Sequence, residues 1–203
     1  MNIETIMRTA PVIPVLVIED VAHAAPIAAA LVAGGLRVLE VTLRTAAALE
    51  VIAEMAKIDG AIVGAGTVLN PADLDAALKA GAQFIVSPGL TDPLARAAIG
   101  NGIPFLPGTA NASDLMRGLD LGLDRFKFFP ATAAGGLPAL KALAAPFGNV
   151  RFCPTGGITE VTAPDWLAEE AVLCVGGSWI VPKGAPDAAL IRQRAAAAAA
   201  FSA

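Results

Sequence analysis

The sequence predicts an α/β protein folded as a (β/α)₈ TIM barrel with a short N-terminal helix. Short runs of β-branched and other apolar residues alternate along the chain with alanine-rich stretches of helical length. Glycine or proline stands at most of the junctions between them. About eight such βα units fit into the chain, whose length is near the lower limit for a barrel of this kind. A doubly wound open sheet is the alternative.

The individual elements follow from these runs. A short helix is expected near residues 3–8. Each predicted strand is rich in valine, isoleucine, leucine or phenylalanine, which suit a buried, pleated surface. Strands are expected near residues 12–18, 36–41, 61–65, 84–86, 104–106, 125–128, 150–154 and 172–175. Helices lie between them, for example at 22–33 and 71–80, and the alanine run at 195–200 predicts a final surface helix.

Composition narrows the classes of protein. A chain of 203 residues suits one domain, expected to span 1–203, and 56% of the residues are apolar. No apolar run reaches the roughly 18 residues that span a bilayer, and the start of the chain lacks the features of a secretory signal, so we expect a cytoplasmic protein without a membrane partner. A net charge of -4 and the lack of a basic patch argue against nucleic acid as a partner.

Cysteine and histidine are scarce. Cys153 and Cys174 each lie in a short apolar run and are expected to be packed thiols. His23 is the only histidine, so a histidine-rich metal site or a conventional serine triad is hard to assemble. We expect His23 to cap or decorate a helix, and we expect no metal and no cofactor.

Lys127 is the lone charge in the run Phe126-Lys127-Phe128-Phe129. An ammonium group surrounded by phenyl rings loses hydration, which favours the neutral amine. A neutral amine attacks ketones and forms Schiff bases. The other interpretation is an edge strand in which Arg125 and Lys127 face water while the phenylalanines face the core. The run alone does not decide between the two.

Glu40 lies on the predicted strand 36–41. Side-chain alternation places Val38, Glu40 and Thr42 on one face, so Glu40 can point into the mouth of a barrel and transfer protons there. The alternative is a buried glutamate paired with Arg44 or Arg37. Arg44 itself is either an anion clamp or a solvated charge at the start of a helix.

Small and hydroxyl residues follow several strands, at the ends where barrel enzymes carry their chemistry. Thr67 ends the sequence Gly64-Ala65-Gly66-Thr67, and Ser87-Pro88-Gly89 follows the fourth strand; both signals are weak alone. The stronger signals are Pro154-Thr155-Gly156-Gly157-Ile158 and Gly176-Gly177-Ser178, which follow the last two strands. Free backbone amides, the hydroxyls of Thr155 and Ser178 and a following helix N-terminus can bind a phosphate dianion. Two ordinary tight turns are the alternative.

Five motifs in order resemble those of one family, the 2-keto-3-deoxy-6-phosphogluconate (KDPG) aldolases, with the overlapping 4-hydroxy-2-oxoglutarate (KHG) aldolases. They are EVTLRT at 40–45, GAGTVL at 64–69, SPG at 87–89, FKFFP at 126–130 and CPTGGI at 153–158. The resemblance runs nearly end to end. It implies a metal-free class I aldolase with a (β/α)₈ barrel, usually a homotrimer, that splits KDPG into pyruvate and D-glyceraldehyde 3-phosphate in the Entner–Doudoroff pathway.

The resemblance also implies roles for residues. Lys127 would form the Schiff base and Glu40 would be the acid and base. The substrate-binding residues would be Arg44 and Thr67 for the pyruvyl carboxylate, Pro88 and Phe129 around the imine, and Thr155, Gly156, Gly157, Gly177 and Ser178 for the phosphate. The chain departs from the family pattern at Thr132, where relatives commonly carry glutamate.

Three other functions stay open. The first is cleavage of KHG as the main or a side activity, although a phosphate site favours KDPG. A phosphosugar isomerase or epimerase would use the same loops and a carboxylate without an amine nucleophile. A non-catalytic barrel that binds phosphoesters would need neither Glu40 nor Lys127.

Overall fold

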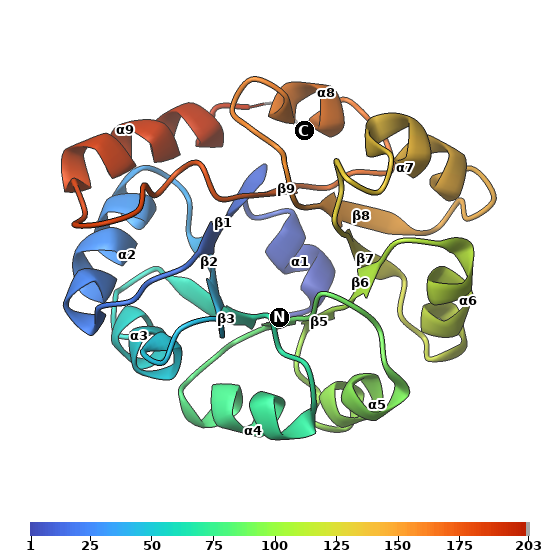
Figure 1. Ribbon diagram of the computed structural model, residues 1–203, viewed down its shortest axis with the longest axis horizontal. Coiled ribbons are helices and arrows are strands. Elements are labelled where there is room, and N and C mark those ends of the chain that lie inside the picture. Colours follow the sequence, from blue (N-terminus) through green and yellow to red (C-terminus); the bar gives the residue numbers. More distant parts are fainter. Residues whose placement is uncertain (202–203) are drawn as a thin grey trace.

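The computed structural model describes residues 1–201 as an α/β fold whose parallel strands lie in the middle, with helices around them (Figure 1). The strands are β1 (Val12–Leu16), β2 (Val38–Thr42), β3 (Ile62–Gly66), β4 (Ile85–Val86), β5 (Phe105–Leu106), β6 (Gly108–Thr109), β7 (Arg125–Phe128), β8 (Arg151–Pro154) and β9 (Val175–Gly177). The helices are α1 (Ile3–Met7), α2 (Ala24–Ala33), α3 (Ala48–Met55), α4 (Pro71–Lys79), α5 (Asp92–Gly100), α6 (Ala112–Asp120), α7 (Gly136–Ala144), α8 (Ala163–Leu167) and α9 (Ala188–Ala199), with a 3₁₀ turn η1 (Val21–His23) before α2.

The strands form two curled parallel sheets. One has six strands in the order β5-β4-β3-β2-β1-β9, and the other has the order β6-β7-β8. Only Pro107 separates β5 from β6 along the chain. At the other side, isolated parallel bridges join Phe152 to Val172 and Thr155 to Gly176. These short links bring the edges of the two sheets together.

Most predicted elements are present, with two differences. The strand expected at 104–106 is followed by a second short strand, β6, because the chain changes its partner at Pro107 from β4 to β7. The strand expected at 172–175 begins only at Val175. There the amide of Val175 donates to the carbonyl of Pro11, and the pairing with β1 continues through Gly176 and Gly177. Glycines have low strand propensity, so residue preference placed this strand too early.

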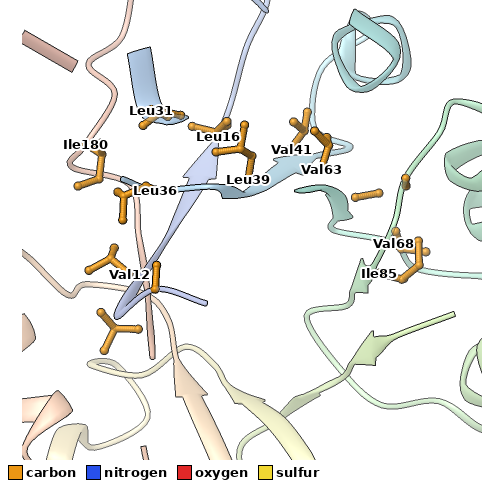
Figure 2. Packing of buried hydrophobic residues seen from close by; sticks show 14 of the residues in the cluster. Val12, Leu16, Leu31, Leu36, Leu39, Val41, Val63, Val68, Ile85 and Ile180 are labelled. Atoms are coloured by element: carbon orange, nitrogen blue, oxygen red, sulfur yellow. The ribbon is translucent and has the colours of Figure 1, made fainter. Parts of the chain in front are cut away.

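Alternation along each strand divides the core into two parts. Leu39 and Val41 of β2 pack outward with residues such as Leu16 and Val63, between the strands and the helices (Figure 2). Val38 faces the other way, into a smaller interior cluster. Because the strands are buried on both faces, their sequences are almost continuously apolar, as parallel strands require.

Helix α1 closes one end of this interior. Figure 1 shows α1 in the middle of the molecule, inside the curve of the strands. Its residues Ile6 and Met7 belong to the interior cluster. Glu4 also pairs with Arg125 at the start of β7, with 2.7 Å between the carboxylate and guanidinium. Hydrogen bonds from Arg8 and Arg125 hold the pKa of Glu4 below its ordinary value. Because α1 covers the end where the strands begin, the carboxyl ends of the strands at the opposite side are the place for an active site.

The alanine run forms the final surface helix, as predicted, and one face of this helix is buried. Ala195 and Ala198 of α9 are fully buried. Helix α9 packs on α2 and its C-terminal Gly34, where an added Cβ would lie only 2.8 Å from the carbonyl oxygen of Arg192. Alanine and glycine therefore serve close helix packing here. No helix within residues 1–201 is both long enough and apolar enough to cross a membrane.

Candidate active site

Lys127 and Glu40 form a buried pair at the centre of the strands. The amine Nζ of Lys127 donates to Oε1 of Glu40 over 3.0 Å, and the two side chains are only 7% and 4% exposed. Lys127 comes from β7 and lies in register with Gly108 on β6 and Cys153 on β8. The edge-strand interpretation is therefore wrong, because β7 has a hydrogen-bonded neighbour on each side.

Strand β7 directs two cations along one face. Arg125 is not turned to water as that interpretation required, because its side chain is 14% exposed and meets Glu4 of α1. Two residues further along the strand, Lys127 meets Glu40. Phe126 and Phe128, which alternate with these cations, pack in the larger core cluster between the strands and the helices. Of the phenyl rings in this run, the one that faces the amine is Phe129, whose centroid lies 5.4 Å from Nζ. Several phenyl rings were predicted to surround the amine of Lys127, but in this run only the ring of Phe129 faces it.

The predicted alternation of side chains along β2 is confirmed, and it directs Glu40 into the interior enclosed by the strands. Val38 faces the interior cluster, and Thr42 donates its hydroxyl to the carbonyl of Leu16 over 2.8 Å. The predicted alternative of an arginine partner for Glu40 is wrong. Arg37 donates to the carbonyl of Gly60 and Arg44 donates to the hydroxyl of Thr42.

Gly66 makes room for the carboxylate. A Cβ added at Gly66 would lie 2.7 Å from Cγ and 2.8 Å from Cδ of Glu40, closer than real side-chain contacts. The sequence indicated that glycine here permits a close backbone approach. The structure identifies the approaching group as the carboxyl group of Glu40.

The pair has a chemical consequence. Nζ of Lys127 and Oε1 of Glu40 are 3.0 Å apart, within reach of a direct proton transfer. An ammonium group cannot attack a carbonyl. The carboxylate of Glu40, which already accepts a hydrogen bond from Nζ, is in position to take the proton. The arrangement is thus a nucleophile with its base, both shielded from water.

A cavity of about 170 Å³ lies near this pair. Neither Lys127 nor Glu40 lines it, but it is lined by Phe129, whose ring faces the amine, and by Val15, the strand partner of Glu40. Six of the predicted binding residues line it: Arg44, Phe129, Thr155, Gly156, Gly157 and Ser178. Its remaining lining residues are Val15, Ile158 and Gly176, and none of them was predicted to bind the substrate, although Ile158 and Gly176 belong to the two glycine motifs. Gly176 could have been found, since it belongs to the Gly176-Gly177-Ser178 run. Val15 is an ordinary apolar strand residue and carried no signal.

The glycine loop after β8 has the geometry of an anion site. Gly156 and Gly157 have φ angles of 106° and 77°, in the left-handed region that side chains disfavour. Successive residues of this kind can turn their amides toward one point and bind an anion. Arg44 is the cation that lines the cavity with them. The helix expected directly after the loop begins only at Ala163, so its N-terminus is not part of this cavity.

Three predicted residues lie outside the lining of the cavity. Gly177 follows Gly176 but packs beneath the ring of Trp179, where a Cβ would lie 2.6 Å from Cη2. Thr67 follows Gly66 and has a φ of 59°, which is rare for a β-branched residue and typical of functional positions. The carbonyl of Pro88 packs against Gly108, the strand neighbour of Lys127. Thr67 and Pro88 are therefore each separated from the Lys127–Glu40 pair by one glycine, Gly66 and Gly108 respectively.

The two cysteines are buried and free, as predicted. Cys174 lies in the interior cluster with Cys153. Burial is the main cause that raises the pKa of the Cys174 thiol well above its ordinary value, and the neighbouring Cys153 thiol and the charge of Glu40 act in the same direction. His23 does not cap α2 with its side chain, and its Nε2 lies 3.9 Å from Asp20. Within residues 1–201, no three histidine, cysteine or acidic side chains are grouped as a metal would require.

A family model for KDPG and KHG aldolases matches residues 3–194. The chain belongs to this aldolase family. The 2-dehydro-3-deoxy-phosphogluconate aldolase of Zymomonas mobilis is 62% identical over 200 residues, which cover 98% of this chain and 96% of that enzyme. The resemblance inferred from the five motifs is confirmed.

Two solved aldolase structures extend the comparison. The KDPG aldolase of Zymomonas mobilis ZM4 with 3-phosphoglycerate has a TM-score of 0.98 at 62% identity, and the match covers 99% of this chain and 96% of that one. The KDPG aldolase of Legionella pneumophila, with pyruvate captured as a covalent carbinolamine intermediate, has a TM-score of 0.95 at 44% identity, covering 98% and 99%. The fold found here is thus that of aldolases of this family.

Proposed function

We propose that this chain is a class I aldolase that cleaves KDPG to pyruvate and D-glyceraldehyde 3-phosphate, the aldol step of the Entner–Doudoroff pathway. The observation that carries the proposal is the buried contact between Lys127 and Glu40 beside a small anion-suited cavity. The carbinolamine captured with pyruvate in the Legionella pneumophila relative supports covalent chemistry on a keto acid. The 3-phosphoglycerate in the Zymomonas mobilis relative supports a phosphorylated ligand.

The proposed reaction begins at Lys127. Glu40 takes a proton from its ammonium group, and the neutral amine attacks the ketone carbon of the substrate. Glu40 returns this proton to the hydroxyl of the carbinolamine, which leaves as water and gives a protonated imine, so Glu40 is a carboxylate again. Glu40 then removes the proton of the hydroxyl next to the bond that breaks. The carbon–carbon bond electrons flow into the imine, the aldehyde leaves, and an enamine remains.

The second half of the reaction converts the enamine back to the imine and then hydrolyses the imine. The enamine carbon takes a proton, which restores the imine, and water adds to the imine carbon to release pyruvate and free Lys127. A protonated imine accepts the electron pair of the broken bond far better than a neutral ketone does. The residues at hand therefore provide the nucleophile, the proton carrier and the electron sink without a further group.

The binding residues are assigned by position. Arg44 and Thr67 would face the carboxylate of the keto acid, while Pro88 and Phe129 would shape the space around the imine. Thr155, Gly156, Gly157, Gly177 and Ser178 would bind the phosphate. Six of these nine residues, Arg44 among them, line the cavity, which supports a common site. We expect no metal, no cofactor and no nucleic-acid or membrane partner.

The finer features of the fold are proposals as well. We propose one domain over 1–203 and a closed (β/α)₈ barrel, in which β5 and β6 together act as the fifth strand and β9 completes the circle through the bridges to β8.

We also propose a homotrimer in the cytoplasm. Exposed Val17, Leu69 and Val161 supply apolar surface for assembly, and light scattering would give about three times the 20.4 kDa chain mass. Two free thiols suit a reducing compartment.

Borohydride reduction in the presence of pyruvate tests the chemistry. Intact-mass and peptide mass spectrometry should find a reduced pyruvyl adduct on Lys127. Lys127→Arg, which keeps the positive charge beside Glu40, should give a folded protein without adduct and without cleavage. Substantial turnover by Lys127→Arg would sink the assignment. A folded wild type that gives no adduct would favour an isomerase, or a phosphoester-binding barrel if it binds ligand without turnover.

KHG is the second candidate substrate, because the matching family model includes KHG aldolases. KDPG ends in a phosphorylated carbon, whereas KHG is one carbon shorter and ends in a carboxylate, so a phosphate site in the glycine loops should favour KDPG. Comparing kcat/KM for the two substrates decides between them. A clear preference for KHG would contradict the assignment of these loops to phosphate.

A further inference from the structure

The segment after β7 runs alongside the glycine loop after β8. The amide of Thr155 donates to the carbonyl of Phe128 over 2.9 Å, and the amide of Ala131 donates to the carbonyl of Thr155 over 2.8 Å. The amide of Thr132 then donates to the carbonyl of Gly156 over 3.0 Å. Pairing between the two chain segments thus continues beyond the ends of β7 and β8, up to the proposed phosphate loop.

The side chain of Thr132 fills the space next to Gly157. A Cβ added at Gly157 would lie 2.6 Å from Oγ1 and 2.7 Å from Cβ of Thr132, so the threonine occupies the place where a side chain would stand. Thr132 is not among the residues that line the cavity. It therefore contacts the glycine loop from outside the proposed site.

Such a contact matters because of the loop's composition. Two successive glycines have more conformational freedom than any other pair, and an anion site needs their amides fixed in one arrangement. The backbone bond at Gly156 restrains the first glycine, and packing by Thr132 restrains the second. A loop that is ordered before the ligand arrives loses less conformational entropy on binding, which strengthens affinity.

We infer that Thr132 is a positioning residue for the Gly156–Gly157 loop and sets the affinity of the enzyme for the phosphate end of its substrate. This inference rests on the proposed function, since it assumes that the loop binds phosphate. Thr132 acts by its shape against Gly157, and it takes no part in imine chemistry at Lys127. Its effect is specific to phosphorylated ligands.

Kinetics of three variants test the inference. Thr132→Gly empties the space beside Gly157 and should raise KM for KDPG about tenfold, with kcat and the KM for KHG changed less than about twofold. Thr132→Val keeps the branched shape and loses the hydroxyl, so it should behave as the wild type. Ala133→Gly adds to the backbone, one residue further along, the same conformational freedom as Thr132→Gly. It serves as the control, and its KM for KDPG should be unchanged. Thermal unfolding checks that all three fold.

The contrary results are equally specific. An equal rise of KM for both substrates, a fall in kcat, or Thr132→Val behaving as Thr132→Gly would each overturn the inference. If the wild type itself fails to cleave either acid, the proposed function fails instead. Calorimetry with glycerol 3-phosphate alone then decides the role of Thr132: weaker binding by Thr132→Gly than by Ala133→Gly supports it, and equal binding rejects it.

Discussion

Replacing Glu40 by glutamine separates the two duties of the buried pair. Glu40→Gln keeps the size of the side chain and an oxygen near the amine of Lys127, but removes the charge and the base. At 3.0 Å, the attraction between the two charges is about 5 kcal/mol for an effective dielectric constant of about 20. Desolvation of both groups offsets much of that attraction, so the net stabilisation is smaller.

The variant should be less stable and much slower. Removal of one partner of a buried pair costs about 3 to 5 kcal/mol at most, and Lys127 can reduce this cost by releasing its proton. Loss of the positioned base should lower kcat about 10²- to 10⁴-fold. A lysine that sheds its proton can still form the imine with pyruvate. Borohydride trapping on Lys127 should therefore persist while cleavage is nearly lost.

The assay is steady-state KDPG cleavage, read as pyruvate release, beside borohydride trapping of the same samples. Urea unfolding gives the free energy of unfolding, and circular dichroism confirms the fold. An unchanged kcat would refute the role of Glu40. Equal loss of trapping and cleavage in a folded protein would refute the separation of amine and base proposed here.

Two further predictions concern the surroundings of the pair. Gly66→Ala would push a methyl group to 2.7 Å from Cγ of Glu40, so kcat should fall about 100-fold with the fold retained, and wild-type kinetics would show that the carboxylate does not need this space. The raised pKa of the Cys174 thiol keeps it protonated at pH 9.0, where an ordinary cysteine is half ionised, so it should resist alkylation in the native protein up to that pH. Cys153 is also buried. Both should react after unfolding, and rapid native modification followed by mass spectrometry would contradict their burial.

Local pattern gave the strands and the directions of their side chains. Alternation along 38–42 placed Glu40 inward, and the strand expected at 125–128, where phenylalanines alternate with cations, has the bounds of β7. The position of a strand and the direction of its side chains depend on residues that are close together in the sequence, so they can be predicted from it. The motifs likewise indicated the family, and the matching family model confirms it.

The pattern failed where backbone pairing departs from residue preference. The start of β9 was missed because its hydrogen bonds run through Gly176 and Gly177. The division of β5 from β6 comes from a change of partner at Pro107. Val15 in the lining of the cavity had no polar group to mark it.

The sequence by itself determined the chemical groups of this protein: an amine in an apolar strand, a carboxylate on an inward face, and glycine loops after the last strands. Only the tertiary structure decided that Lys127 and Glu40, 87 residues apart, share a hydrogen bond and that neither arginine near Glu40 takes that place. The physical reason is that register and curl of the sheets bring distant strands together. A linear sequence records which groups exist, and packing in three dimensions selects their partners.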